Sequence, residues 1–429
     1  MASDFDSPGG PGIVHPAMRP LPLALPLGLA LLAGCGEQRP SFEPEKVNAT
    51  PIGKSLPRGF LLGTSTGPAT DSWNRFDEDV TLMKRLGSNA YRFSVEWSRL
   101  EPTPGQWNAE AEARYRQWAQ ALRAQGLQPV VTLHHFTLPT WVARSGGWEN
   151  PATLEAFERY AGRVADLLGG EVDWWCTLNE PNVYAVFGYL DGVWPPGKKD
   201  PKAMATVLAN LLEAHARAAR QLRTHDLVDA DGDGKATQVG LAHHVRAFQP
   251  ASGGLTDEFF NDSVPNALRT GRISLSVPGS VALRRDVPGL EGSIDYLGLN
   301  YYVPAGQDSN DPGRELHPEG LYLFLKRYAA LGLPLLVTEN GLDDRTGERR
   351  PYYLKSHLYA VEQAVAAGAD VRGYFHWSLL DNFEGAEGHE PRFGLFRVDR
   401  STPEWERQAT PAVETFREAA RNLGLTPTP

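Results

Sequence analysis

From about residue 58 onward, short apolar runs alternate with longer stretches of helical composition. The run 128–136 and the run 334–339 are apolar almost throughout and end in polar residues, which is typical of strands buried on both faces of a parallel sheet. The pattern predicts eight strands, at 59–66, 89–97, 128–136, 172–179, 238–248, 294–302, 334–339 and 370–378. It predicts helices between them, for example at 108–125, 151–168, 201–225 and 352–368.

Eight β–α alternations predict an α/β fold, a single (β/α)8 TIM barrel over residues 58–425. The alternative is a doubly wound open sheet, but no Gly-x-Gly-x-x-Gly follows the first strand. A chain of 429 residues suits one such barrel, and the sequence shows neither a shorter repeat nor a second domain.

The N-terminus has the features of an export signal. Arg19 precedes an apolar run from Leu21 to Leu32, which ends in Leu-Ala-Gly-Cys at Cys35. This ending resembles a bacterial lipobox, so we expect a signal peptide within 1–35 and lipidation of Cys35. The alternative is a plain secretory signal cut nearby, which would leave a soluble exported protein.

Two neighbouring segments complete this N-terminal prediction. Residues 1–17 are acidic and rich in Gly and Pro, so Met18 is the better start of the signal. Residues 36–57 are polar and contain several Pro, which predicts a linker that tethers the barrel. We therefore expect an exported lipoprotein, anchored in a membrane of the bacterial cell envelope.

The amino-acid composition limits the classes of ligand that the protein is expected to bind. The chain has 42 Lys and Arg against 52 Asp and Glu, a net charge of −10, which argues against nucleic acid. Eleven Trp and fourteen Tyr suit a sugar-binding cleft, because pyranose C–H faces pack on aromatic rings, although core packing accounts for most of them. Cys176 lies in an apolar run and is expected in the core, so no disulfide with a lipidated Cys35 is expected.

Polar residues collect where the predicted strands end. In barrels of this kind the active site lies at the carboxyl ends of the strands. Successive strands end near Arg92, His134-His135, Asn179-Glu180, Asn300-Tyr301-Tyr302, Glu339-Asn340 and His376-Trp377. Such a set of acids, amides and rings predicts an active site at this face.

Two of these residues form a carboxylate pair. Glu180 and Glu339 end the fourth and seventh strands, which face each other across a barrel mouth. A single Glu at a strand end is more often a salt-bridge partner. Hydrolysis of a glycoside needs two carboxyl groups that flank the scissile bond, so the pair indicates a glycosidase.

Several motifs in order support this. The stretches Thr177-Leu178-Asn179-Glu180-Pro181 and Thr338-Glu339-Asn340-Gly341 resemble the signature motifs of glycoside hydrolase family 1, the β-glucosidase and β-galactosidase family. The resemblance runs from about residue 58 to 400. It includes Tyr91-Arg92-Phe93-Ser94, Thr132-Leu133-His134-His135, Asn300-Tyr301-Tyr302, Trp377-Ser378-Leu379-Leu380-Asp381-Asn382-Phe383-Glu384 and Arg392-Phe393-Gly394.

The resemblance implies a retaining mechanism without a cofactor, with Glu180 as acid/base and Glu339 as nucleophile. It implies that Arg92 and Tyr302 hydrogen-bond the nucleophile and keep it charged. The remaining implied sugar contacts are Asn179 at the 2-OH, His135 at the 3-OH side, Trp377 beneath the ring, Glu384 at the 4-OH and 6-OH, and Asn300 and Phe393 along the pocket. Packing is the alternative role for Asn300 and Phe393.

The chain departs from the family at three positions. Thr70 stands where the family has a Gln that binds the 3-OH and 4-OH, Gly385 where it has a Trp, and Phe136 where it has another Trp. Two donors to the sugar are therefore missing, and we expect a roomier non-reducing end that accepts substituted or extended sugars. Glu384 would repel a phosphate, which argues against 6-phospho-sugars.

Asp229, Asp231 and Asp233 precede Gly234 with the spacing of the start of an EF-hand loop. The twelfth position is Gly240 rather than Glu, and Asp and Gly also favour ordinary turns. A structural Ca²⁺ at this loop is one expectation and a plain turn is the other.

Together these features predict a membrane-anchored exo-β-glycosidase that acts on β-glycosides or oligosaccharides by double displacement. Two alternatives remain, a transglycosylase with the same carboxylates and a sugar-binding surface lipoprotein that has lost turnover. The sequence does not identify the sugar.

Overall fold

The computed structural model describes residues 40–67, 70–248, 257–277, 280–302, 316–402 and 404–428. Ser41–Pro429 forms one compact unit. The predicted signal peptide, the start at Met18 and the lipidated Cys35 lie outside the described residues.

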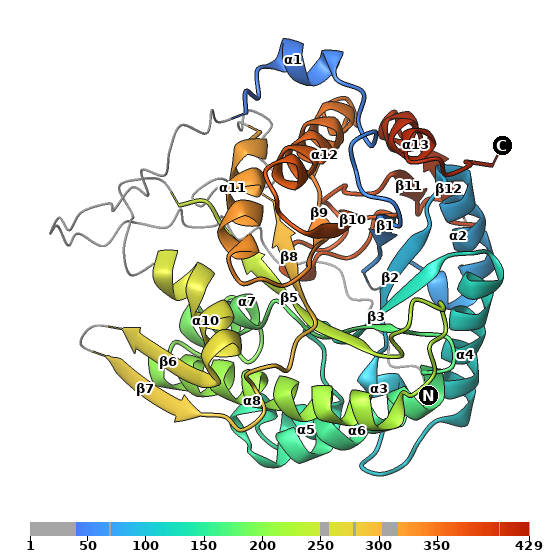
Figure 1. The fold of residues 1–429 in the computed structure, drawn as a ribbon. Helices are drawn as coiled ribbons and strands as arrows, with labels where there is room; N and C mark the ends of the chain where they lie inside the picture. Colours follow the sequence, from blue (N-terminus) through green and yellow to red (C-terminus); the bar gives the residue numbers. More distant parts are fainter. Residues whose placement is uncertain are drawn as a thin grey trace, which may run out of the picture. The chain divides into compact units, whose positions relative to one another are not determined.

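Eight parallel strands form a closed barrel (Figure 1). The strands are β1 (Leu61–Ser65), β2 (Ala90–Ser94), β3 (Gln128–His134), β4 (Trp174–Asn179), β5 (Gln238–Val245), β8 (Tyr296–Tyr301), β9 (Leu335–Asn340) and β10 (Val371–Trp377). Their order is β1-β10-β9-β8-β5-β4-β3-β2, and the pairing of Ser65 with Trp377 joins the first strand to the last. Closure confirms the predicted barrel and excludes the open doubly wound sheet.

Each predicted strand is present, but several end earlier than the apolar pattern suggested. The third was predicted to reach residue 136, whereas β3 ends at His134. Phe136 has a φ of 72°, in the left-handed region, and a strand cannot continue through that conformation. The chain therefore turns sharply at the point where the polar residues begin.

Helices follow the strands around the barrel (Figure 1). The predicted helices are present as α4 (Ala109–Ala124), α6 (Ala152–Leu168), α8 (Pro201–His225) and α12 (Arg350–Ala366). Helix α4 starts where the sequence supplies a cap, because the Asn108 side chain accepts from the backbone N–H groups of Glu110 and Ala111. The other helices are α1 (Pro44–Ala49), α2 (Ser72–Leu86), α3 (Trp97–Leu100), α5 (Thr140–Arg144), α7 (Pro181–Ala185), α10 (Ser263–Thr270), α11 (Pro318–Ala329) and α13 (Ala412–Asn422).

Two small antiparallel hairpins were not predicted. One pairs β6 (Arg272–Val277) with β7 (Val281–Asp286), and the other pairs β11 (Phe396–Asp399) with β12 (Glu406–Ala409). In β6 the buried Ile273 and Leu275 alternate with exposed neighbours. This period of two marks a half-buried strand rather than a barrel strand.

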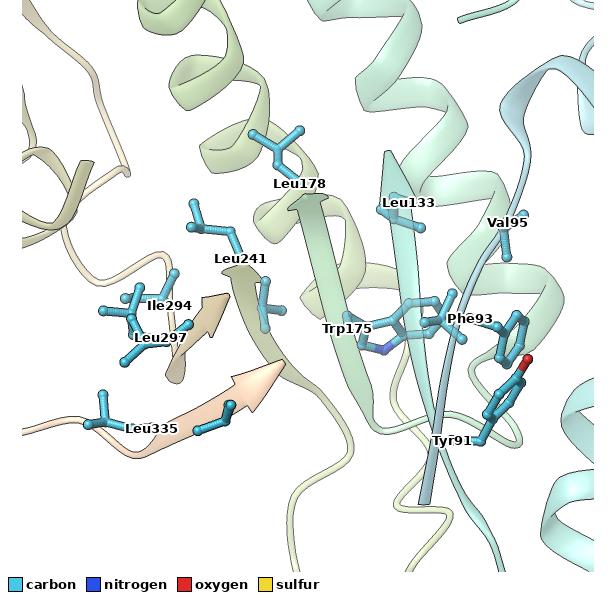
Figure 2. Close-up of a cluster of buried hydrophobic side chains, with 14 of the residues drawn as sticks. Tyr91, Phe93, Val95, Leu133, Trp175, Leu178, Leu241, Ile294, Leu297 and Leu335 are labelled. Atoms are coloured by element: carbon cyan, nitrogen blue, oxygen red, sulfur yellow. The ribbon is translucent and has the colours of Figure 1, made fainter. Parts of the chain in front are cut away.

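Alternate strand residues pack on opposite sides of the barrel wall. Trp175 belongs to the large cluster between strands and helices, where Figure 2 shows it with Leu133, Leu241 and Leu297. Its neighbour Trp174 belongs to a separate cluster that takes residues from six strands. The members of that cluster are Ala90, Val130, Trp174, Tyr296, Leu336 and Phe375. It fills the barrel interior, so the barrel is solid below the strand ends.

The segment 41–57, predicted as part of a linker, packs onto the barrel unit instead. Val47 in α1 and Ile52 are fully buried in the large cluster. The Ile52 carbonyl accepts a hydrogen bond from Asn422 Nδ2 at 2.7 Å. The prediction of a tether was wrong for these residues, because Pro and polar side chains dominate the segment while its few apolar side chains supply the packing. The described residues contain no helix long and apolar enough to cross a membrane.

Candidate active site

Glu180 stands at the end of β4, where the backbone turns. It has left-handed dihedral angles of φ 45° and ψ 58°, and α7 begins at the next residue, Pro181. Its backbone N–H donates to the carbonyl of Ala242 in β5 at 2.7 Å. The strained turn fixes the Glu180 side chain at the barrel mouth, and the residue is 6% exposed.

Two donors reach the same oxygen of Glu180. His244 Nδ1 lies 2.7 Å from Glu180 Oε1, and Asn300 Nδ2 lies 2.8 Å from it. Arg246 Nε donates to His244 Nε2 at 3.1 Å, so Nε2 carries no proton. His244 is therefore the neutral tautomer that donates from Nδ1.

Glu339, at the end of β9, is buried and accepts two stronger donors. Arg92 Nη1 lies 2.5 Å from Glu339 Oε1, and Tyr302 Oη lies 2.6 Å from Oε2. His135 Nε2 is 4.0 Å from Oε1. A guanidinium and a phenol on a buried carboxyl group favour its ionised form.

A chain of amides joins the two carboxyl groups. Arg92 Nη2 donates to Asn179 Oδ1 at 2.6 Å, and Asn300 Nδ2 lies 3.2 Å from the same oxygen. Thr338 Oγ1 donates to Asn300 Oδ1 at 2.6 Å and orients that amide. Asn179 Nδ2 is buried and has no partner within the described residues, so it is available to a ligand.

Burial and mutual repulsion govern the titration of the pair. Burial raises the pKa of Glu339, Arg92 and Tyr302 oppose that rise, and repulsion from Glu180 adds to it. Burial also acts on Glu180, but the His244 and Asn300 donors lower the pKa of this carboxyl. Two carboxyl groups so coupled titrate as a pair, and their hydrogen-bond partners decide which one carries a shared proton.

The other predicted sugar contacts surround this pair. Ser94 Oγ lies 2.9 Å from His135 Nδ1, and burial lowers the pKa of His135 to about 3, so the ring is neutral. Trp377 Nε1 donates to Glu384 Oε1 at 2.9 Å. Burial raises the pKa of Glu384 to about 8. The Trp377 ring lies 5.8 Å from the His135 ring, and the Phe393 ring lies 6.0 Å from the Tyr302 ring.

All ten predicted catalytic and sugar-binding residues therefore lie in one contact network. The network also contains His244 and Arg246, which the sequence analysis did not single out. A signal was present, since His243-His244 ends the fifth strand much as His134-His135 ends the third. Two histidines at a strand end, followed by a cation two residues later, mark the mouth of the barrel as polar there too.

The three aspartates of the predicted calcium loop lie elsewhere. Their carboxylate oxygens approach within 4.8 Å of one another just before β5 begins, at the end of the barrel opposite the carboxylate pair. All three are exposed. Asp229 accepts from the backbone N–H groups of Gly232, Asp233 and Gly234. The cluster has no part in the active site.

Two cavities flank the site. The Trp73 cavity, of about 480 Å³, is lined by residues that include Trp73, Thr70, Ser94 and His135. The Tyr184 cavity, of about 620 Å³, is lined mainly by apolar and aromatic residues. These include Phe136, Leu138, Tyr184, Val193, Trp194, Pro195, Phe383 and Gly385. The consecutive residues His135 and Phe136 thus face different cavities across the sharp turn after β3.

The positions that depart from the family pattern border these cavities. Thr70 lines the Trp73 cavity, and its hydroxyl lies 2.6 Å from Ser72 Oγ. Phe136 and Gly385 line the Tyr184 cavity. The small residues Thr70 and Gly385 therefore leave space in two different cavities.

The chain is similar to known glycosidases in sequence. The sequence matches glycosyl hydrolase family 1 over residues 57–264 and 306–424. These ranges contain both carboxylates but not Asn300 or Tyr302. A β-galactosidase of Pyrococcus woesei is 30% identical over 463 residues, covering 87% of this chain and 90% of that protein.

Two further similarities bear on the chemistry. The chloroplastic galactolipid galactosyltransferase of Arabidopsis thaliana is 32% identical, with 77% of this chain and 54% of that protein covered. The structure of a β-glucosidase from Thermotoga maritima in complex with deoxynojirimycin matches with a TM-score of 0.75 and 29% identity. That match covers 87% of this chain and all of the other.

Proposed function

The chain belongs to glycosyl hydrolase family 1, and on that premise we propose that it is an exo-acting, retaining β-glycosidase with Glu339 as nucleophile and Glu180 as acid/base. The observation that supports these roles is the difference between their donors. Glu339 faces the full charge of Arg92 and the Tyr302 hydroxyl, whereas Glu180 faces the neutral His244 and an amide. When the pair shares one proton, the full positive charge of Arg92 favours Glu339 as the carboxylate and leaves the proton to Glu180, opposite to the directions in which burial and the His244 and Asn300 contacts shift the two pKa values.

In the first step Glu339 attacks the anomeric carbon and forms a glycosyl ester, while the bond to the leaving oxygen breaks. Glu180 gives its proton to that oxygen. His244 and Asn300 both donate to Oε1 of Glu180, so the resulting carboxylate is stabilised on that oxygen and Oε2 serves the leaving group. In the second step Glu180 takes a proton from water, which attacks the anomeric carbon from the same face, and the sugar is released with its configuration retained.

The other residues of the contact network bind the sugar ring. Asn179 is held through Oδ1 by Arg92 and Asn300, which leaves its unpartnered Nδ2 for the 2-OH. A hydrogen bond at this hydroxyl strengthens as charge develops at the neighbouring anomeric carbon. Trp377, held by Glu384, supplies the surface under the ring, and His135 supplies a neutral contact.

The Tyr184 cavity receives the leaving group. Tyr184 lies one helical turn after Glu180, and its N–H donates to the Glu180 carbonyl at 3.0 Å, so the cavity adjoins the proton donor. Its two charged lining residues, Glu149 and Lys198, are paired with each other at 2.5 Å. The surface left to the substrate is apolar, which favours an aryl or alkyl aglycone.

A transglycosylase is the second candidate, supported by the galactolipid galactosyltransferase relative and by the same cavity. An apolar acceptor alcohol in the Tyr184 cavity would resolve the glycosyl ester in place of water. Hydrolysis and transfer differ only in that second step.

We also propose that the enzyme is exported and anchored to a membrane of the bacterial cell envelope through a lipid on Cys35. This rests on the segment from Arg19 to Cys35. The chemistry requires no cofactor, and any Ca²⁺ at the aspartate loop would be structural.

A panel of nitrophenyl β-glycosides tests the function. We expect release of nitrophenol from at least one sugar, retention of anomeric configuration by proton NMR, and loss of activity in Glu339→Gln. Product analysis with added hexanol separates hydrolysis from transfer. Binding of the sugars without any release in the wild-type chain would instead indicate the sugar-binding lipoprotein that has lost turnover.

A further inference from the structure

The Trp73 cavity is separate from the proposed leaving-group site, and the lining residues of the two cavities differ. It is bounded by the start of α2, the end of β2 and Trp405 near β12. It shares His135 with the sugar site, and its volume of about 480 Å³ exceeds what a few water molecules need. The catalytic scheme above makes no use of it.

Its lining has the composition of a carbohydrate site. Six aromatic residues and several hydrogen-bonding groups line the same space. The aromatic residues are Trp73, Tyr91, Phe93, Tyr115, Trp118 and Trp405, and the polar residues include Asp71, Asn74, Glu96 and Arg99. The Arg99 guanidinium lies 4.4 Å from the Trp73 ring centroid, which holds that ring in place. Rings for C–H faces and carboxylates for hydroxyl groups are the two contacts that a pyranose needs.

One buried group on the cavity wall has no partner. Trp118 Nε1 makes no hydrogen bond within the described residues, and Trp118 lines the cavity. An unpaired buried donor is costly, so its presence indicates that a polar ligand or ordered water completes it.

The cavity adjoins the sugar platform directly. A Cβ on Gly67 would lie 3.1 Å from Trp377 Cη2 and 2.9 Å from Asn382 Oδ1, so Gly67 rests against the ring. Gly67 and His135 also line the cavity. The Thr70 hydroxyl, on the same cavity wall, lies 2.6 Å from Ser72 Oγ.

We propose that the Trp73 cavity is a subsite for a second sugar unit, carried on the hydroxyl of the first sugar that faces His135. The inference rests on the proposed glycosidase function and names its substrate class, aryl or alkyl β-glycosides of disaccharides. In the reaction the bond between the inner sugar and the aglycone breaks and Glu339 forms an ester with the inner sugar. Glu180 protonates the aglycone oxygen, and water then releases the disaccharide intact.

The test compares nitrophenyl β-monoglycosides with nitrophenyl β-disaccharides linked through the 3-OH or 4-OH of the inner sugar. With the full chain we expect nitrophenol and intact disaccharide to appear together, with no nitrophenyl monoglycoside as an early product. Early release of a monosaccharide would overturn the inference and leave the proposed function standing. Failure on both substrate types would overturn the proposed function itself.

Substitutions test whether residues of the Trp73 cavity cause the preference for disaccharide substrates. Trp73→Ala and Arg99→Ala should each lower the ratio of kcat/KM on the disaccharide to kcat/KM on the monoglycoside, Trp73→Ala by about tenfold. Arg99 is exposed, so its substitution keeps the test valid if Trp73→Ala does not fold. Trp107→Ala, which removes a half-buried Trp outside the cavity, should leave the ratio unchanged. An unchanged ratio in both cavity variants would contradict the subsite.

Discussion

His244 donates from Nδ1 to Oε1 of Glu180 across 2.7 Å, from the strand next to the one that carries the carboxyl group. Arg246 holds His244 neutral by donating to its other ring nitrogen. The contact therefore stabilises the ionised form of Glu180. It is specific to the basic form of the acid/base residue, which the enzyme needs between its two steps.

This contact predicts a pH effect. Glu180 must be protonated to start the reaction, so activity falls as pH rises through its pKa. His244 lowers the pKa of Glu180, so His244→Phe should raise it. We expect the alkaline limb of the kcat/KM profile to move to higher pH, by about one unit for one lost hydrogen bond. His225→Phe, at a surface His paired with Asp166, is the control and should not move it. A shift to lower pH would contradict the assigned tautomer.

The roles of the two carboxyl groups predict unequal responses to the leaving group. In Glu180→Gln the proton donor is lost while Glu339 remains. Hydrolysis of glycosides with poor leaving groups should fall by about 10²- to 10⁴-fold, whereas formation of the glycosyl ester from dinitrophenyl glycosides should be far less affected. Pre-steady-state release of the phenol measures this first step. Equal losses across leaving groups would mean that Glu180 is not the acid.

How much of this arrangement the sequence could predict depends on the kind of contact. Strands buried on both faces, such as 335–340, are apolar runs that end in a functional residue, so Glu339 could be placed at the barrel mouth from the pattern alone. Its partners Arg92 and Tyr302 followed from the family resemblance. His244 and Arg246 did not, because their role depends on the turn at Glu180, where a left-handed residue aims the carboxyl group at the neighbouring strand.

The N-terminal segment shows where prediction from the sequence fails. Composition over residues 41–57 predicted a tether, because Pro and polar residues dominate it. Whether Val47 and Ile52 find an apolar surface is decided by α12 and α13, several hundred residues away, and no local pattern carries that information. The sequence does not reveal cavities for the same reason, since the Trp73 cavity combines residues from the first third of the chain with Trp405.

The packing of this segment predicts a stability effect. Ile52 is fully buried, so Ile52→Ala should lower the free energy of unfolding by about 2–5 kcal/mol, the usual cost of a cavity at such a site. Chemical denaturation followed by tryptophan fluorescence measures the loss. Lys54→Ala, an exposed neighbour, should change the free energy by less than about 0.5 kcal/mol. Equal effects of the two substitutions would mean that the segment is a tether after all.

The lipobox predicts a location. In a bacterial host the full chain should partition with membranes, and Cys35→Ala should release it into the soluble exported fraction. Metabolic labelling with a palmitate analogue should mark the wild type but not Cys35→Ala. Cys176 is buried in β4, so Cys176→Ser tests whether a thiol elsewhere accounts for any label. Continued membrane partition of Cys35→Ala would contradict the lipid anchor.

The aspartate loop predicts a response to metal. Repulsion from Asp173 and Asp233 adds to burial in raising the pKa of Asp231, so a cation among these carboxylates would relieve an unfavourable contact. With Ca²⁺ bound, we expect a chelator to lower the melting midpoint by about 2–4 °C for each kcal/mol of binding energy lost. Asp231→Asn is the cleaner variant, since Asp231 accepts a hydrogen bond only from the Asp233 N–H in the loop, whereas Asp229 accepts three. That variant should abolish the chelator effect. A midpoint that chelator and Ca²⁺ both leave unchanged would make the loop an ordinary turn, in which the carboxylates serve only to cap its backbone amides.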